Sequence, residues 1–330
     1  MKGWKDILEE IRVRSISEGS RELARRFNFL PYMIERYSFL SDDLTGFISS
    51  LLKRGEHVIL CNYLKFNCEE VIEELGDMGF SFERIRFVEN SLSIKSSPRS
   101  PTIGSTHLFF KGAYYVYRDF TSLIPPIILN PKEGERVLDV ASSPGGKAFH
   151  LLLRMKDRGL LIANEAYQKR VSPLKNNMIR MCLRSYVITN FKELPFNNEF
   201  ERVLIDAPCS GEGIIMYDPS RRTRTSQEDL AKLVEREIRL LRSSVLSSKG
   251  YILYSTCSIA PEENEYVISA ILEEFKGKIE VVEPPFNYWG KGLEEFMHLK
   301  FNPEVKKCIR IYPKDSSGFF ICLLRKLFNY

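Results

Sequence analysis

The sequence lacks the features that mark several classes of protein. None of its apolar runs approaches the roughly eighteen consecutive residues that cross a bilayer, and its start, Met1 to Glu10, carries charges on both sides of a few apolar positions. Its seven cysteines include no C-x-x-C pair, and it has only four histidines. We therefore expect no membrane segment, no metal site and no secreted disulfide framework, and we predict reduced thiols in the cytoplasm.

The charged residues say little about partners. The formal net charge of +5 over 330 residues permits an acidic partner such as nucleic acid but does not require one, because an ordinary solvated surface explains the same balance. At this length we expect two domains, or one catalytic domain with an attached module.

Three segments are indicated along the chain. Residues 1–55 show amphipathic helical spacing with basic residues in between, for which a solvated helical face is the simplest interpretation. Residues 56–104 are compatible with a small RNA-recognition-like module, although the aromatic RNP signature is absent. This module is expected to contain a strand at 58–63, a helix ending at Gly79, and short strands at 85–88 and 92–94. Residues 105–330 follow a serine- and proline-rich linker and form the third segment.

The third segment alternates apolar runs with helical patterns. Strands are predicted at 136–140, 160–163, 186–189, 203–205, 251–254 and 318–324. This alternation of strands and helices is typical of a parallel α/β sheet with helices on both faces.

A tight loop joins the first of these strands to its helix. It consists of Ala141, Ser142, Ser143, Pro144, Gly145, Gly146 and Lys147. Glycines let the backbone approach a ligand, and the following helix offers free N–H groups. The loop has neither the Walker nor the G-x-G-x-x-G spacing. Glu165 ends the next strand, where a Rossmann-type fold receives ribose hydroxyls. Together they predict a nucleotide-like cofactor, with a helix-capping loop and an incidental glutamate as the alternative.

Two short motifs carry cysteines, DAPCSG at 206–211 and STCS at 255–258. Each follows an apolar, β-branched run, so each cysteine should project from the carboxyl end of a strand, where open α/β sheets bind ligands. A lone cysteine is usually a small buried hydrophobe. Two thiols that share an edge with the carboxylate of Asp206 instead favour nucleophilic chemistry, but the residues alone do not say which thiol attacks.

The chain resembles the RNA (cytosine-5)-methyltransferases of the NOL1/NOP2/Sun type. The matching stretches are NYLK at 62–65, LDVASSPGGK at 138–147, ANE at 163–165, DAPCSGEG at 206–213, YSTCS at 254–258, ENE at 263–265 and RIYP with GFFIC at 310–322. The resemblance implies a Rossmann-like, S-adenosylmethionine-dependent methyltransferase core with a small α+β RNA-recognition-like amino-terminal domain.

The resemblance also implies roles for the catalytic residues. Cys257 would add to C6 of cytosine as a thiolate, a strong nucleophile near neutral pH, and so make C5 reactive. Cys209 would release the product, Asp206 would hold the N3/N4 edge of the base, and Lys147 would hold the base or a phosphate. The target nucleotide would have to be unpaired or flipped out.

For the cofactor, the resemblance maps the loop onto the methionine part, Glu165 onto the ribose and Arg170 onto a supporting role. The whole expected set is Ala141, Ser142, Ser143, Pro144, Gly145, Gly146, Lys147, Glu165, Arg170, Asn190 and Asp206. Asn190 stands where the family usually has an acid that meets the adenine amino group, and its carbonyl oxygen can still accept that hydrogen bond.

RNA is the expected partner of a protein that we expect to act as a monomer. Transfer RNA is favoured because the chain is compact, without an extra RNA-binding domain after the core. Ribosomal RNA is the alternative, because relatives on both substrates share these motifs. A non-catalytic RNA-binding or assembly factor on the same fold is less favoured. Arg221, Arg222 and Arg224 follow the first cysteine motif and predict either phosphate contacts or a solvated cluster.

Overall fold

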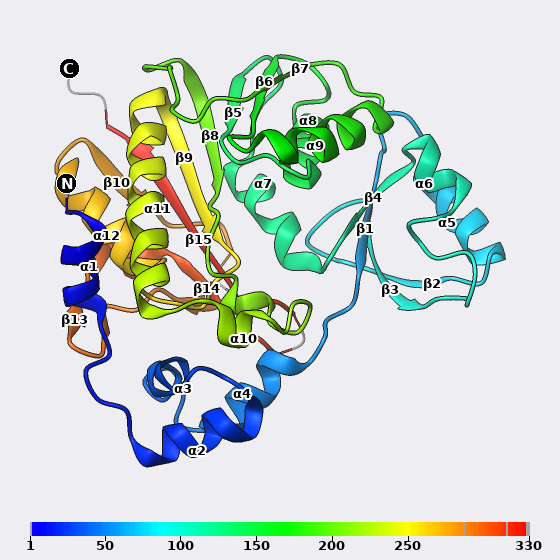
Figure 1. Ribbon diagram of the computed structural model, residues 1–330. Coiled ribbons are helices and arrows are strands. Elements are labelled where there is room, and N and C mark those ends of the chain that lie inside the picture. Colours follow the sequence, from blue (N-terminus) through cyan, green and yellow to red (C-terminus); the bar gives the residue numbers. More distant parts are fainter. Residues whose placement is uncertain (1, 287, 315, 328–330) are drawn as a thin grey trace. The chain divides into compact units, whose positions relative to one another are not determined.

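The computed structural model describes residues 2–286, 288–314 and 316–327 (Figure 1). The chain divides into two compact units. The first unit consists of residues 1–54, 207–243 and 254–330, and the second unit consists of residues 55–206 and 244–253. Among the described residues, no helix combines the length and the apolar character that crossing a membrane requires.

The second unit contains a small antiparallel sheet in the order β2-β3-β1-β4. Its elements are β1 (Val58–Cys61), α5 (Cys68–Asp77), β2 (Ser81–Arg84), β3 (Ser91–Ser96) and β4 (Tyr114–Tyr117). Ile59, Val71, Leu75 and Leu92 belong to the core between the sheet and α5. Because β4 pairs with β1, residues beyond the predicted boundary at 104 also supply this sheet.

The predicted strand at 85–88 is wrong. The strand lies at 81–84 instead, and residues 85–90 form the turn that leads into β3, with the Ile85 N–H donating to the Ser91 carbonyl at 3.1 Å. The apolar Phe87 in this turn makes a tertiary contact rather than belonging to a strand, because its ring packs against the Phe120 ring with centroids 5.8 Å apart.

The second unit also contains parallel strands in the order β8-β5-β6-β7. They are β5 (Arg136–Asp139), β6 (Leu160–Asn164), β7 (Tyr186–Thr189) and β8 (Phe200–Asp206). The helical elements of this unit's later part are α6 (His107–Lys111), η1 (Phe120–Leu123), α7 (Ile124–Leu129), α8 (Gly146–Arg154) and α9 (Gln168–Arg180). Figure 1 shows α8 and α9 beside β5, β6 and β7. The predicted parallel α/β arrangement is confirmed for these strands.

The first unit combines amino-terminal helices with later parts of the chain. Its helical elements are α1 (Trp4–Ile11), α2 (Glu18–Phe27), α3 (Pro31–Tyr37), α4 (Leu44–Leu52), η2 (Glu212–Ile214), α10 (Arg221–Arg224), α12 (Glu265–Glu274) and η3 (Pro303–Lys307). Its strands are β10 (Ile279–Val282), β11 (Gly290–Lys291), β12 (Glu295–Phe296), β13 (Leu299–Lys300), β14 (Ile309–Ile311) and β15 (Phe319–Lys326). Helix α11 (Gln227–Ser247) and strand β9 (Ser248–Thr256) each have residues in both units.

The carboxy-terminal strands depart from the predicted parallel pattern. Both β14 and β10 pair with β15 in antiparallel fashion. The connection between β14 and β15 is shorter than the crossover that parallel neighbours require. The fold is therefore a mixed α/β sheet preceded by a small antiparallel sheet, and the predicted fold class is confirmed.

The prediction that the thiols are reduced is wrong for one pair. Cys61 and Cys68 form a disulfide, with their Cα atoms 6.0 Å apart. The residues between them turn back, because the Lys65 and Phe66 N–H groups both donate to the Asn62 carbonyl at 3.0 Å. This turn brings the end of β1 to the start of α5, within the range that a disulfide needs. The remaining cysteines are not disulfide-bonded: Cys182, Cys209, Cys257, Cys308 and Cys322.

Candidate functional site

In the second unit, the loop between β5 and α8 is shaped by its two glycines. Gly145 has a φ of +106°, a conformation that side chains rarely adopt. A Cβ atom on Gly146 would lie 2.9 Å from the Tyr115 ring and 3.0 Å from the Tyr117 ring, and the Tyr117 hydroxyl donates to the Gly146 carbonyl at 2.6 Å. The backbone therefore packs directly on aromatic side chains, and substitution of either glycine would displace the loop.

Glu165, directly after β6, has an unused hydrogen-bonding atom. The side chain is 2% exposed, and its Oε1 accepts the Tyr167 N–H at 2.9 Å. Its Oε2 is buried without a hydrogen-bond partner in the part of the chain that the structure describes, although the Arg170 Nε lies 3.6 Å away. Such an atom is costly to leave unsatisfied. A ligand hydroxyl would satisfy it, which fits the predicted ribose contact.

Arg170 and Asn190 fix the surroundings of Glu165. The Arg170 Nη2 donates to the Ser143 carbonyl at 2.7 Å and so ties the glycine loop to α9. The Asn190 Nδ2 donates to the Glu165 carbonyl at 2.5 Å, which leaves Oδ1 as the atom that this side chain can offer to a ligand donor.

Sequence reasoning missed two aromatic side chains beside these residues. Tyr167 follows Glu165 closely and is 49% exposed, and Phe191 follows Asn190 directly and is 40% exposed. Exposed rings next to strand-end polar residues are candidates to pack against a purine. Their position directly after predicted strand ends was the available signal.

Lys147 and Asp206 meet although they are far apart in the sequence. The Lys147 Nζ lies 2.6 Å from the Asp206 Oδ2, and the two side chains are 13% and 34% exposed. The missed residue here is Asp139, which ends β5 and accepts a hydrogen bond from Ser142 at 2.8 Å. Burial raises the pKa of Asp139 to about 7, and the charge of Asp206 acts in the same direction.

In the first unit, the two cysteine motifs lie side by side. The Sγ atoms of Cys209 and Cys257 are 3.4 Å apart. The hydrogen bond to Cys257 and burial raise the pKa of the Cys209 thiol well above its ordinary value. The Gly213 N–H donates to the Cys257 carbonyl at 3.0 Å, and a Cβ on Gly213 would lie 2.0 Å from the Gly318 carbonyl oxygen. This close approach of three backbone segments fixes both cysteine loops.

The serines that directly follow the two cysteines also lie close together. The hydroxyls of Ser210 and Ser258 lie 3.3 Å apart. Glu263 accepts the Ser210 N–H and the Ser210 hydroxyl, each at 2.6 Å. Burial raises the pKa of Glu263 to about 7, and the charge of Glu212 adds to this effect. The ENE stretch therefore supplies a buried carboxyl next to the cysteine loops.

Arg36 from α3 is the functional candidate that sequence reasoning missed most clearly. It is 1% exposed and bonds both Glu212 and Glu262. The sequence feature that could have revealed it is an arginine close to the apolar residues Tyr32, Met33 and Ile34, which are also buried in α3.

The three arginines after the first cysteine motif mostly hold the protein together. Arg221 donates to the Ser210 carbonyl and pairs with Asp218 at 3.1 Å, and Arg222 donates to the Phe27 carbonyl at 3.1 Å. Arg224 is exposed and remains the candidate for an outside contact.

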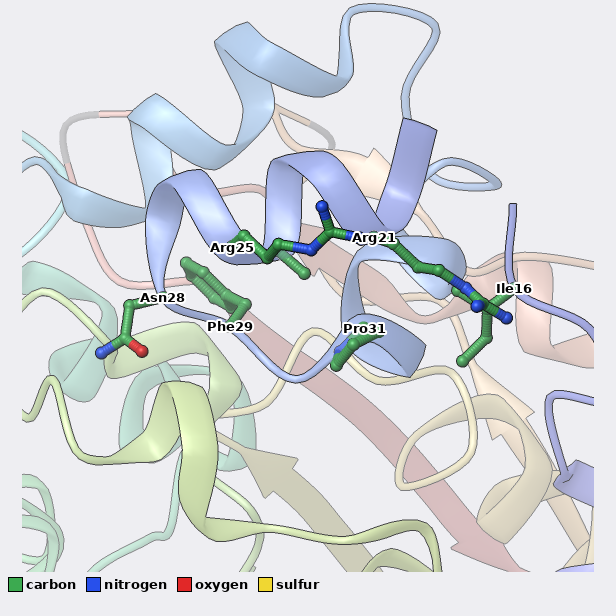
Figure 2. Close-up of a pocket in the computed structure, with 7 residues that line it drawn as sticks. Ile16, Arg21, Arg25, Asn28, Phe29 and Pro31 are labelled. Atoms are coloured by element: carbon green, nitrogen blue, oxygen red, sulfur yellow. The ribbon is translucent and has the colours of Figure 1, made fainter. Parts of the chain in front are cut away.

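The amino-terminal helices carry a pocket of about 470 Å³. It is lined by Ile16, Arg21, Ala24, Arg25, Asn28, Phe29 and Pro31. Figure 2 shows the Arg21 and Arg25 side chains on α2, with the Phe29 ring nearby. Both arginines are exposed, whereas Phe29 is buried with the Arg222 guanidinium 5.9 Å from its ring centroid. The pocket therefore combines two exposed positive side chains with a buried aromatic ring.

The parallel sheet, the glycine loop after its first strand and the carboxylate after its second are features of a Rossmann-like methyltransferase core. The chain belongs to the family described as 16S rRNA methyltransferase RsmB/F, which matches residues 126–325 and is the NOL1/NOP2/Sun family of the resemblance. The buried Oε2 of Glu165, which has no hydrogen-bond partner among the described residues, fits a hydroxyl of the methyl donor S-adenosylmethionine.

Individual relatives agree with this assignment. The chain is 32% identical over 282 residues to the 25S rRNA (cytosine-C(5))-methyltransferase nop2 of Schizosaccharomyces pombe, covering 82% of this chain and 46% of that protein. It is 32% identical over 302 residues to a tRNA (cytosine(49)-C(5))-methyltransferase of Pyrococcus abyssi, covering 89% and 95%. The crystal structure of a methyltransferase homolog protein from Pyrococcus horikoshii superposes with a TM-score of 0.81 at 28% identity, covering 94% of this chain and 100% of that one. The chain spans about half the length of several curated relatives that it matches, between 41% and 60%.

Proposed function

We propose that this protein is an S-adenosylmethionine-dependent RNA cytosine-C5 methyltransferase that forms 5-methylcytidine through a covalent adduct between Cys257 and C6. The observation that carries the proposal is the pair of thiols that lie 3.4 Å apart, at the start of two loops, without a disulfide between them. Methylation at C5 needs one nucleophile to add to C6 and one group to assist its departure, and two adjacent thiols meet both needs.

In the proposed reaction the Cys257 thiolate attacks C6 and moves electron density onto C5. Asp206 holds the N3/N4 edge of the base by hydrogen bonding. Lys147, 2.6 Å from Asp206, offsets the charge of that carboxylate and offers a contact to the base or to a phosphate. S-adenosylmethionine supplies the methyl group that C5 receives.

The second half of the reaction removes the C5 proton and breaks the bond between C6 and sulfur. Cys209 is the proposed release residue, acting directly or through a base that it orients. Its raised pKa keeps it protonated near neutral pH, so Cys209 can give its proton to the departing Cys257 sulfur, and the thiolate that remains takes up the C5 proton, directly or through a base that it orients.

Residues of the second unit are proposed to hold the cofactor. The loop from Ala141 to Gly146 would accommodate the methionine part, Glu165 would bond the ribose hydroxyls, and the Asn190 Oδ1 would accept from the adenine amino group. The unsatisfied Oε2 of Glu165 supports this assignment.

Transfer RNA is the proposed substrate. The Pyrococcus abyssi relative, which the chain matches over 95% of its length, is a tRNA methyltransferase. Ribosomal RNA is the second candidate, because the family description and several other relatives refer to it. A monomer in the cytoplasm stays a prediction.

The RNA backbone is proposed to contact exposed arginines of the first unit. Arg21 and Arg25 line the pocket of the amino-terminal helices, and Arg224 lies in α10. Positive side chains in such positions neutralise phosphates without reading the sequence.

Trapping the adduct tests the proposal. The Cys209→Ala variant, incubated with tRNA transcripts and S-adenosylmethionine, should accumulate a protein–RNA complex that survives denaturation, and Cys257→Ala should form none. Cys182→Ala, which removes an exposed thiol, is the matched control. An adduct formed by the Cys257 variant would overturn the assignment of the nucleophile, and mapping the modified cytidine in tRNA against rRNA would decide the substrate.

A further inference from the structure

Arg36 joins the two cysteine loops from a segment that carries neither cysteine. Its Nε and Nη2 donate to the two carboxylate oxygens of Glu262 at 2.7 and 2.6 Å, and its Nη1 donates to Glu212 at 2.9 Å. Tyr37, the next residue of α3, donates its hydroxyl to the other oxygen of Glu212 at 3.1 Å. Glu212 belongs to the Cys209 loop and Glu262 follows the Cys257 loop, so one guanidinium spans both.

The turn held by Arg36 is bonded to the residues that flank the thiols. Glu263 binds Ser210, the residue after Cys209. Asn264 accepts the Thr256 hydroxyl at 2.6 Å and donates to the Ser258 carbonyl at 3.0 Å, and these two residues flank Cys257. A movement of this turn would therefore move both thiols.

The charges around the thiols give Arg36 a second effect. Glu212, Glu237, Glu262 and Glu263 are all at most 1% exposed. Glu237 of α11 has no hydrogen-bond partner on either carboxylate oxygen among the described residues, and its field reaches Cys209 together with that of Glu263. The cluster also faces further titratable or charged groups, which are Tyr32 and Tyr37 of α3, Arg236 of α11, Tyr254 of β9 and Arg310 of β14. Several carboxyls cannot share a buried site without a counter-charge or protons, and Arg36 brings that charge to two of them.

We propose that Arg36 is a positioning residue that holds the Cys209 and Cys257 loops in one arrangement and sets the charge around the two thiols. The amino-terminal helices are then part of the catalytic machinery. The consequence for methyl transfer rests on the proposed function, whereas the effect on the thiols does not.

Alkylation of Cys257 tests this role without RNA or cofactor. In the Cys209→Ala protein, the rate of Cys257 modification by iodoacetamide is measured from pH 6 to 10, by mass spectrometry of its peptide. Adding Arg36→Met should raise the pH midpoint by about one unit, because two carboxylates lose their counter-charge, so that modification below the midpoint slows about tenfold. Arg14→Met, which removes an exposed arginine of the same segment, should leave the midpoint unchanged.

A conservative variant separates charge from geometry. Arg36→Lys should restore the midpoint, because the charge is kept, but should still lower kcat for RNA methylation several-fold at unchanged KM, because an ammonium group cannot hold both acids at once. A folded Arg36→Met protein with the midpoint of the Cys209→Ala protein would overturn the proposal.

A second variant covers the case in which Arg36→Met does not fold. Glu262→Gln keeps a hydrogen-bonding partner for Arg36 but removes one negative charge, so it should lower the midpoint. An unchanged or raised midpoint would equally overturn the proposal. If the thiol results hold while no RNA is methylated, the proposed function fails and the role of Arg36 in holding the loops stands.

Discussion

The cysteine loops of the first unit and the glycine loop of the second unit are built in opposite ways. In the cysteine loops, Glu212, Glu262 and Glu263 bond to Arg36 and Ser210, and burial covers the whole cluster. Beside the glycine loop, Glu165 is equally buried but keeps one oxygen unpaired. Groups that act on a substrate need a fixed position before it arrives, whereas groups that hold a ligand need an unused bond for it. Substitutions in the first region should therefore cost stability, and substitutions in the second should cost ligand affinity.

The largest effect is expected at Gly213 of the cysteine loops. In Gly213→Ala, the new Cβ would meet the Gly318 carbonyl oxygen at 2.0 Å and the Cys257 carbonyl oxygen at 2.8 Å. Because backbone must move, the free energy of unfolding should fall by about 3 kcal/mol or more, as measured by urea denaturation. Gly19→Ala in α2 meets no atom within 4 Å and should be neutral or slightly stabilising. A Gly213→Ala protein as stable as wild type would contradict the close packing.

The pH dependence of stability should show the buried carboxyl of the same region. Glu263 has a folded pKa raised to about 7, above its unfolded value near 4.5. A carboxyl with a raised pKa adds stability below the unfolded value, and that contribution disappears as the pH rises through about 7. The free energy of unfolding attributable to Glu263 should thus fall by on the order of 3 kcal/mol between pH 4.5 and 8.

Urea denaturation at several pH values in that window measures this effect. The glutamine side chain of Glu263→Gln cannot ionise, so the free energy of unfolding of this variant should fall less steeply with pH. Glu193→Gln changes an exposed residue and should keep the wild-type pH dependence. Parallel slopes for wild type and Glu263→Gln would show that Glu263 does not titrate in this window.

Glu165 provides the contrasting test in the second region. Glu165→Ala removes a buried carboxylate with an unpaired oxygen, so the melting temperature should change little. S-adenosylmethionine should bind about 10- to 100-fold more weakly by calorimetry, because the contact to a charged acceptor is lost. Glu193→Ala serves as the exposed control. A large loss of stability with unchanged affinity would reverse the comparison between the two regions.

The smallest effect is expected at the pocket of the amino-terminal helices. The Arg21→Ala/Arg25→Ala double variant should reduce the slope of log K against log salt by about 1.4 for a single-stranded RNA, because two phosphate contacts are lost. Fluorescence anisotropy with a labelled tRNA fragment, with Arg14→Ala as control, measures this. An unchanged slope would remove the pocket from the RNA contact surface.

Local patterns predicted where several residues of the candidate site lie in the fold. Cys209 and Cys257 follow apolar, β-branched runs, so their motifs were expected at strand ends, and the structure places their sulfur atoms together. Glu165 and Asn190 were found in the same way, at the ends of β6 and β7. Local patterns failed where an apolar residue served a distant contact, as Phe87 does with Phe120, and where a turn decided the result, as between Cys61 and Cys68.

The sequence by itself determined which chemistry-bearing residues stand at which strand ends, because strand and helix periods act within a few residues. Only the tertiary structure decided which side chain, distant in the sequence, pairs with each of these residues. Arg36 belongs to a segment that we expected to be a solvated helical face, yet it pairs with Glu262 across a separation of 226 residues. A buried charge is stable only where packing supplies its counter-charge, and no local pattern states which residue that is.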